Sequence, residues 1–335
     1  MENNGKKKVI FLGSASRLMS TGGKEALVAL CSSDDRFISD FWNSDVIVTT
    51  RWWDPIITLL KLVKPGLITI FLADGHFSLL NLNKSSNRRQ GKNIFESDYC
   101  DIYLLPDLIS LHATSGYPGI KYSYHPNFWD NPGITFSERE QKAYDIVFVY
   151  GNDPYFEVRH QKKLFTLVDQ VVERFGLKHS ICHIVPKGKN GEILSRQIAD
   201  PENVFVGLEG RGVPLSRNAV YLCTPSTIVW QLVAISGKVA LIDIYEEDSC
   251  FHSSLTKVRN ADDLEKVLIQ NEEYWKKIFD DFRRVLGDKS LPVIIDETLN
   301  RDYTDKIRRG NRFSALWRHT HRDLLSSIKS LLFSK

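Results

Sequence analysis

Asp74 and Gly75 end the apolar run "GLITIFLADG" and form the first polar group whose residue types could carry chemistry. A carboxylate at the tip of a β-strand, once desolvated, can take a proton from a hydroxyl group. Because Asp-Gly is also a common turn pair, the alternative is that Asp74 only shapes a turn. We therefore treat Asp74 as a candidate general base.

A second polar group follows the apolar run in "CHIVPKGKNG", which contains His183, Lys187 and Lys189. A histidine and two lysines can neutralise a phosphate group and stabilise its departure. The alternative is a histidine at the edge of the core beside two solvated lysines. We treat His183 as a candidate catalytic residue and the two lysines as candidate donor-binding residues.

A third group lies in "YLCTPSTIVWQLVAISGKVALID", residues 221–243, which predicts a strand, a small polar turn, a helix and a strand. The small residues of this turn leave hydroxyls and the N–H groups of the helix start uncovered, which suits an anion. Ser226 and Thr227 can donate to phosphate oxygens. The alternative is simple N-capping of the helix by Thr224 or Ser226.

Two further residues are weaker candidates. Glu209 lies in the glycine-flanked loop "GLEGRG", where its carboxylate could bind a ribose diol. The alternative is an ordinary exposed glutamate. His125 precedes Pro126 in a segment rich in aromatic residues and glycine, which suits a substrate-facing loop and makes His125 a candidate catalytic group.

The elements that must position these residues alternate between short apolar strands and amphipathic helices, which predicts parallel sheets covered on both faces. The polar stretch 131–141 interrupts this alternation and predicts a linker. We therefore expect an α/β protein with two Rossmann-like domains that face a cleft (GT-B-like), formed by residues 1–135 and 142–300. Expected strands cover 7–13, 44–50, 66–75, 99–107, 144–151, 179–191, 203–207, 219–225 and 238–244, and the one over 179–191 runs into a basic turn that holds Lys187 and Lys189. Expected helices cover 22–32, 52–63, 161–176 and 262–287, and the last stretch forms one helix or two.

Composition limits the class of protein. The chain has 335 residues, of which 42% are hydrophobic and 25% charged, as in soluble globular proteins. No apolar run approaches the roughly 18–20 residues needed to cross a bilayer. The five cysteines are scattered and predict reduced, buried thiols. We find no metal-binding motif and no nucleic-acid-binding module, and we expect no cofactor and no nucleic acid partner.

Charge is concentrated in the last segment, residues 301–335. This segment carries nine Lys or Arg residues and three Asp residues, a net charge of +6, whereas the rest of the chain has a net charge of −3. Apolar residues recur there at helical spacing. We therefore expect a basic amphipathic helical tail that could lie on an anionic membrane surface, or that packs on the body with a solvated basic face.

In this order, the polar groups resemble those of bacterial sialyltransferases of the two-domain GT-B type and related CMP-sugar-dependent glycosyltransferases. The sequence "ADG" resembles the acidic motif of the first domain, "CHIVPKGK" takes the place of a His-Pro motif, and "PST" resembles the Ser-Thr motif. Ala73 stands where that family has its first acidic residue, and Pro186 is not adjacent to His183.

The resemblance implies roles for the candidate residues. Asp74 would be the general base on the acceptor hydroxyl, and His183 would contact the CMP phosphate. Ser226 and Thr227 would hold that phosphate, and Glu209 would bind the ribose. It further implies an acceptor-binding first domain, a nucleotide-sugar-binding second domain, and inversion by direct displacement without a metal.

We therefore expect a glycosyltransferase that moves sialic acid or a related acidic sugar from a CMP donor to a glycan or glycolipid acceptor. The basic tail would hold this enzyme in the cytoplasm at the inner face of a membrane. The alternatives are a UDP- or GDP-sugar glycosyltransferase, a CDP-polyol phosphotransferase, and a sugar-nucleotide epimerase or a non-catalytic binding protein on the same scaffold.

Overall fold

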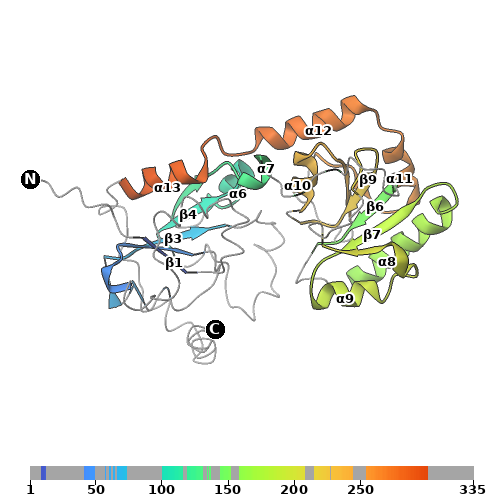
Figure 1. Cartoon of the computed structure of the whole chain (residues 1–335). Helices are drawn as coiled ribbons and strands as arrows, with labels where there is room; N and C mark the ends of the chain where they lie inside the picture. Colours follow the sequence, from blue (N-terminus) through green and yellow to red (C-terminus); the bar gives the residue numbers. More distant parts are fainter. Residues whose placement is uncertain are drawn as a thin grey trace, which may run out of the picture. The chain divides into compact units, whose positions relative to one another are not determined.

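A computed structural model places most of the chain in two compact units, shown in Figure 1. The first unit comprises Met1–Asn127 and Leu286–Lys335, and the second comprises Phe128–Val285. Asp74, Glu209, Thr227 and the tail 301–335 lie outside the described residues. The structure describes residues 9–12, 41–49, 57, 60–61, 63–64, 66–73, 100–115, 119–130, 134, 136, 144–151, 158–207, 215–226, 228–243 and 254–300.

The first unit is built on a parallel sheet of five strands, which lie side by side in the order in which the chain forms them. Alternate residues of these strands are buried in different clusters, so the sheet is covered on both faces: Val46 and Val48 belong to one cluster and Ile47 to the other. The strands are β1 (Val9–Leu12), β2 (Val46–Thr49), β3 (Ile68–Leu72), β4 (Ile102–Leu105) and β5 (Ile120–Ser123).

Helix α13 (Leu291–Asn300) belongs to the first unit although it lies late in the sequence. Its residues Leu291, Ile294 and Ile295 are buried in the same apolar cluster as β1 to β4. The predicted second domain, 142–300, included this helix. The observed division differs, because residues 286–300 complete the core of the first unit and the chain leaves that unit within α7 (Asn127–Asp130).

The segment before α13 is fixed to residues that follow β4 and β5. Leu286 forms an antiparallel bridge with Asp107, and Ser290 forms a parallel bridge with His125. A side chain at Gly287 would place its Cβ 2.5 Å from the carbonyl carbon of Tyr124, so only glycine allows this approach. Asp107 also accepts a hydrogen bond from the Ser110 amide and begins α6 (Leu108–Ala113).

The second unit is built on a parallel sheet of six strands in the order β11-β10-β9-β6-β7-β8. Read from the other edge, this is the 3-2-1-4-5-6 order of the Rossmann fold. The order reverses between β6 and β9, and ligands of such sheets bind beyond the carboxyl ends of the strands at that point. The strands are β6 (Ile146–Val149), β7 (Ile181–Val185), β8 (Val204–Val206), β9 (Val220–Cys223), β10 (Lys238–Ile242) and β11 (Lys257–Val258).

The helices of this second unit pack in pairs. Helix α8 (Val158–Phe175) contacts α11 (Ala261–Leu268), and α10 (Ile228–Ala234) contacts α12 (Glu272–Arg284), where the Trp230 and Phe282 rings lie 4.6 Å apart. Right-handed crossovers that run in opposite directions from β6 and β9 place α8 and α10 on opposite faces of the sheet. Helix α9 (Lys189–Ser195) and a 3₁₀ turn (Pro201–Asn203) link β7 to β8.

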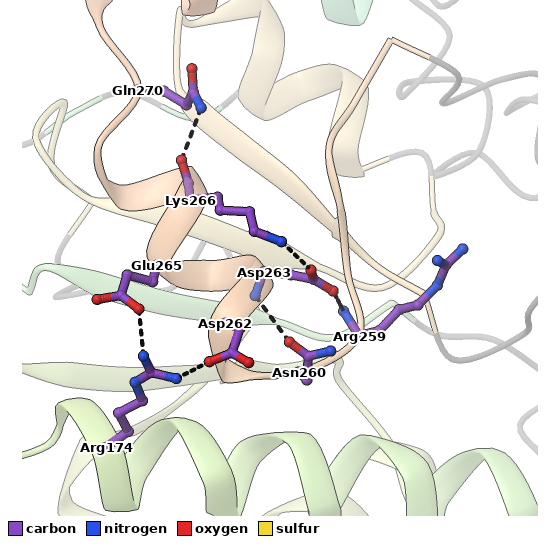
Figure 2. A network of polar contacts seen from close by, with 8 residues as sticks. All are labelled: Arg174, Arg259, Asn260, Asp262, Asp263, Glu265, Lys266 and Gln270. Carbon is purple, nitrogen blue, oxygen red and sulfur yellow. Dashed lines mark hydrogen bonds and ion pairs between the residues drawn. The ribbon is translucent and has the colours of Figure 1, made fainter.

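Both units are therefore α/β with parallel sheets, and the predicted fold class of two Rossmann-like domains is confirmed. Helices of the second unit are joined by side-chain contacts, and Figure 2 shows those of α11. Arg174 of α8 pairs with Asp262 and Glu265 of α11, which fixes the two helices side by side. No helix among the described residues is both long and apolar enough to cross a membrane.

Candidate functional site

The carboxyl ends of β6 and β9 meet at the point where the strand order reverses. Gly151 lies two residues beyond β6, and Thr224 directly follows β9. The Thr224 hydroxyl accepts a 2.6 Å hydrogen bond from the Gly151 amide, and the Thr224 amide donates to the Val149 carbonyl. Thr224 is buried, so its hydroxyl ties the two strand ends together and serves the scaffold.

Ser226 differs from Thr224 in having an unused hydroxyl. Its Oγ is buried and has no hydrogen-bond partner in the part of the chain that the structure describes. Leaving a buried hydroxyl unpaired costs about 1–3 kcal/mol. A ligand oxygen at this strand end would remove that cost once the side chain rotates to meet it. Ser226 is therefore the side chain at the reversal point best suited to bind a ligand.

Gly151 makes room for Ser226. A side chain at Gly151 would place its Cβ 2.7 Å from the Ser226 Cβ and 3.0 Å from its Oγ. Such contacts are too short, so the serine can approach the end of β6 only because residue 151 is glycine. Helix α10, which starts at Ile228, has seven residues, so its dipole is small and the hydroxyl and the glycine define the site. Thr227 lies outside the described residues.

His183 lies in the middle of β7 and does not reach the strand end. Its side chain is 3% exposed, and its ring stacks on Phe148 of β6 with the centroids 5.1 Å apart. Its Nδ1 is joined to the Tyr150 hydroxyl by a 2.8 Å hydrogen bond. Burial lowers the His183 pKa to about 4, although the Asp200 charge opposes this, so the ring is neutral near pH 7.

A neutral ring inside the sheet offers no positive charge to a phosphate. The role that the sequence suggested for His183 therefore has no support from its position, which fits the alternative of a buried histidine. No described contact brings its ring to Ser226, and we assign His183 to the core of the sheet.

Lys187 and Lys189 follow β7, the neighbour of β6, and lie at the same edge of the sheet as Ser226. Both side chains are exposed. Lys187 lies over Gly207, where a Cβ would lie 2.9 Å from the lysine Cε. The φ of +72° at Gly207 is a second reason for glycine at this position. Lys189 is the first residue of α9 rather than part of a turn. The pair supplies positive charge to the carboxyl edge.

Asp74, the candidate base of the first unit, lies outside the described residues. Ala73 directly precedes it at the end of β3. The Tyr124 hydroxyl donates a 2.6 Å hydrogen bond to the Ala73 carbonyl, and the Ala73 amide donates to the Leu104 carbonyl. Both the amide and the carbonyl of Ala73, the residue before Asp74, are therefore hydrogen-bonded.

His125 contacts the segment that returns the chain to the first unit. Its amide donates to the Lys289 carbonyl at 2.6 Å, and its ring Nδ1 lies 3.2 Å from the Gly287 carbonyl oxygen. These contacts explain the position of His125 by the fold. A catalytic role for it stays a prediction, as does the ribose-binding role of Glu209, which lies outside the described residues.

Sequence reasoning missed the parts played by Gly151, Thr224 and Tyr124. Gly151 had a usable signal, because a glycine directly after the strand in "DIVFVYG" permits close backbone approach. Nothing in the sequence shows that the hydroxyls of Thr224 and Tyr124 reach backbone groups 73 and 51 positions away. Cys182 and Cys223 are buried free thiols, as predicted.

Within the described ranges, no group of three His, Cys, Asp or Glu residues could hold a metal ion. Comparison with known proteins supports the fold. No family model matches the chain. No curated protein sequence matches it either.

Solved structures match over most of the chain. MnaA of S. aureus, solved with UDP, is 8% identical and covers 88% of this chain and 95% of its own, with a TM-score of 0.53. The UDP-GlcNAc 2-epimerase of Neisseria meningitidis, solved with UDP-GlcNAc, is 10% identical over 87% and 98%, with a TM-score of 0.52. The wall teichoic acid polymerase TagF, soaked with CDPG, is 10% identical over 89% of each chain, with a TM-score of 0.53. At such low identity these likenesses establish a shared two-domain fold.

Proposed function

We propose that the protein is a glycosyltransferase that uses a nucleotide-activated sugar, and that its donor is a CMP-linked acidic sugar such as sialic acid. The observation that carries this proposal is the unpaired Ser226 hydroxyl, which lies beside Gly151 at the reversal point of a Rossmann sheet. A phosphate oxygen is the natural partner for this hydroxyl, and Lys187 and Lys189 add positive charge at the same edge.

The donor would lie on the second unit, with its phosphate at Ser226. Transfer then requires a base for the acceptor hydroxyl, and Asp74, which follows β3 in the sequence, is our candidate. The acceptor oxygen forms a bond to the anomeric carbon as the bond from that carbon to the phosphate oxygen breaks. The acceptor proton passes to Asp74, and CMP leaves with both electrons of the broken bond. Direct displacement of this kind inverts the anomeric centre.

A donor panel tests the proposal. Purified protein is incubated with CMP-sialic acid, UDP-GlcNAc, a GDP-sugar and CDP-glycerol, each with and without a glycan acceptor, and the released nucleotide is measured. We expect release of CMP that depends on the acceptor. Asp74→Asn should lower turnover by about 100-fold while the donor dissociation constant stays unchanged. Near-normal turnover of that variant would remove Asp74 from the mechanism.

A sugar-nucleotide epimerase is the second candidate, because the UDP-GlcNAc 2-epimerase compared above, solved with UDP-GlcNAc, shares this fold. An epimerase converts its nucleotide sugar without an acceptor. Acceptor-independent conversion of UDP-GlcNAc, with no product formed from CMP-sialic acid, would favour this alternative and overturn the CMP proposal. Release of CMP from CDP-glycerol in the presence of an acceptor would instead indicate a polyol phosphotransferase.

A further inference from the structure

A cavity of about 350 Å³ lies in the second unit, between helix α8 and the residues that end β10 and β11. It shares no residue with the Ser226 site. Its volume is at the lower end of the range of small-molecule sites, about 300–1,000 Å³, so it has room for a small ligand. The residues that line it are Lys162, Lys163, Thr166, Leu167, Gln170, Ile242, Asp243, Val258 and Arg259.

Asp243 supplies the carboxylate of this lining and directly follows β10. Its side chain is only 4% exposed, and both Nε and Nη2 of Arg259 donate to its Oδ2 at 2.7 Å. Aspartate side chains are almost never buried to this degree unless their charge is paired. The Arg259 guanidinium supplies that pairing and balances the charge of Asp243.

The other carboxylate oxygen of Asp243, Oδ1, is left without a donor. Both Arg259 contacts go to Oδ2, and no hydrogen bond or ion pair among the described residues reaches Oδ1. An ionised carboxylate accepts through both oxygens, and a buried acceptor without a donor is costly. A ligand that donates a hydrogen bond to Oδ1 would remove this cost. Because Arg259 already balances the charge, a neutral hydroxyl is a better partner for Oδ1 than a cation.

The two lysines of the lining do not set the charge of the ligand. Lys162 and Lys163 are both exposed. Water and salt screen the charges of exposed side chains, so these two contribute little selectivity for an anion. The buried part of the lining, which contains the Asp243 carboxylate and apolar side chains, therefore determines which ligand fits.

Apolar and hydrogen-bonding side chains complete the lining. Leu167, Ile242 and Val258 are buried and form an apolar surface. Thr166 and Gln170 are four positions apart on α8, so they lie on the same face of the helix. Their hydroxyl and amide groups can both donate and accept hydrogen bonds. A mostly apolar lining with a few polar groups that fix orientation is typical of small-molecule sites.

A sugar ring has C–H groups on its faces and hydroxyls around its edge, which matches this combination of side chains. We propose that the cavity binds one neutral sugar unit, with a hydroxyl that donates to Asp243 Oδ1. Further hydroxyls of the sugar bind Thr166 and Gln170, and its C–H groups pack on the apolar side chains. This site is separate from Ser226, and the proposal does not depend on the reaction proposed there.

Methyl NMR spectra of the full chain, labelled at its Ile, Leu and Val methyl groups, test this proposal. Leu167, Ile242 and Val258 line the cavity, so their signals report on it directly. The probes are glucose, galactose and N-acetylglucosamine, each added up to about 50 mM because a ligand of this size gains little binding free energy. We expect at least one of these sugars to shift all three signals.

Two variants test the polar contacts. Gln170→Leu removes one hydrogen bond to the sugar and should weaken binding by about 5-fold. Asp243→Asn should weaken it by about 10-fold or more, because a hydrogen bond to a charged oxygen is the stronger kind. The matched control is Gln197→Leu, which makes the same change at an exposed position outside the cavity and should leave binding unchanged.

Three outcomes would overturn the proposal. The first is that none of the sugars shifts the three methyl signals, and the second is that Gln197→Leu weakens binding as much as Gln170→Leu. The third is that inorganic phosphate shifts these signals and the sugars do not, because the cavity would then bind an anion.

The test stays decisive if Asp243→Asn fails to fold through loss of its ion pair with Arg259, which thermal unfolding would show. Gln170→Leu changes only an exposed side chain and tests the same site. The titration involves no donor and no turnover. Its failure is therefore distinct from failure of the donor panel, which bears on Ser226 and Asp74.

Discussion

The Tyr124 hydroxyl donates a 2.6 Å hydrogen bond to the carbonyl oxygen of Ala73, the residue before Asp74. Tyr124 is 1% exposed, so this bond is made inside the first unit and holds the end of β3 against the residue that follows β5. The orientation of a catalytic side chain depends on how firmly the backbone that carries it is held. We therefore propose that Tyr124 is a positioning residue for Asp74, the next residue in the chain after Ala73.

Tyr124→Phe should lower turnover by about 10-fold, because it frees the Ala73 carbonyl without removing the aromatic ring. Donor affinity should not change, since the donor is proposed to bind the second unit. Initial rates and donor titrations measure the two effects. Tyr103→Phe is the control, because the Tyr103 hydroxyl accepts from the Cys100 amide beside the start of β4. Equal losses of turnover in both variants would argue against a role specific to Tyr124.

Ser226→Ala should have opposite effects on stability and on binding. Removing a buried hydroxyl that has no partner should leave the free energy of unfolding unchanged or raise it by up to about 1 kcal/mol. Loss of the ligand contact should weaken nucleotide affinity by about 10-fold. Urea unfolding and nucleotide titration measure these changes. Thr224→Val gives the contrast. The Gly151 amide loses its acceptor in this variant, so the free energy of unfolding should fall by about 1–3 kcal/mol.

Gly151→Ala should disturb the same strand end through crowding. The added methyl group would lie 2.7 Å from the Ser226 Cβ, so the serine must move. We expect a loss of about 1–3 kcal/mol in the free energy of unfolding and weaker nucleotide binding. Gly66→Ala is the control, because a Cβ there meets no atom within 4 Å. If both alanine variants bind nucleotide like the native protein, Gly151 does not shape the site.

His183 predicts a dependence of stability on pH. Its pKa is about 4 in the folded protein and 6.5 in the unfolded chain, so the unfolded chain binds more protons between these values. The contribution of neutral His183 to the free energy of unfolding is therefore complete above about pH 6.5. It falls as the pH drops toward 4, with a loss of about 2 kcal/mol by pH 5. Urea unfolding at pH 7 and pH 5 measures it. The variant Tyr150→Phe/His183→Phe lacks both partners and should show a flatter profile; an equal slope would assign the effect to other groups.

The tail 301–335 predicts binding to anionic membranes. Each Lys or Arg near such a surface contributes about 1 kcal/mol, and the net charge of the tail is +6. The chain should therefore sediment with vesicles that contain phosphatidylserine, and high salt should release it. A chain shortened to residues 1–300 should stay in solution. Equal binding of the two chains would place the membrane contact elsewhere or exclude it.

Much of the fold could be predicted, because buried parallel strands form short apolar runs separated by helices. Each of the nine predicted strands contains an observed one, and the predicted helix 161–176 corresponds to α8. The sequence left open whether 262–287 forms one helix or two, and it forms two, because Asn271 caps a new start at Glu272. Strand β5 was missed, since "IKYS" has no apolar run and its residues are only half-buried.

The site was less predictable, because sequence patterns show that a side chain is buried but not what covers it. The apolar face of "LPVIIDETLN" predicts a packed segment, yet only the structure shows that α13 packs on the first sheet. Likewise, "ICHIV" does not reveal that the His183 ring stacks on Phe148, which lies opposite it on the neighbouring strand and 35 positions earlier in the sequence. Ser226 stays a candidate, and the sequence could point to it because small hydroxyl residues after a strand are themselves a local signal.

The return of the chain through Gly287 to α13 has a consequence for biosynthesis. The second unit is one continuous stretch, so a ribosome delivers all of it before the last part of the first unit has emerged. Until residues 291–295 have been made, the apolar cluster that contains Val46 and Leu104 lacks the buried side chains of α13. The second unit should therefore finish folding first, and the first unit would need chaperone protection until α13 has been made.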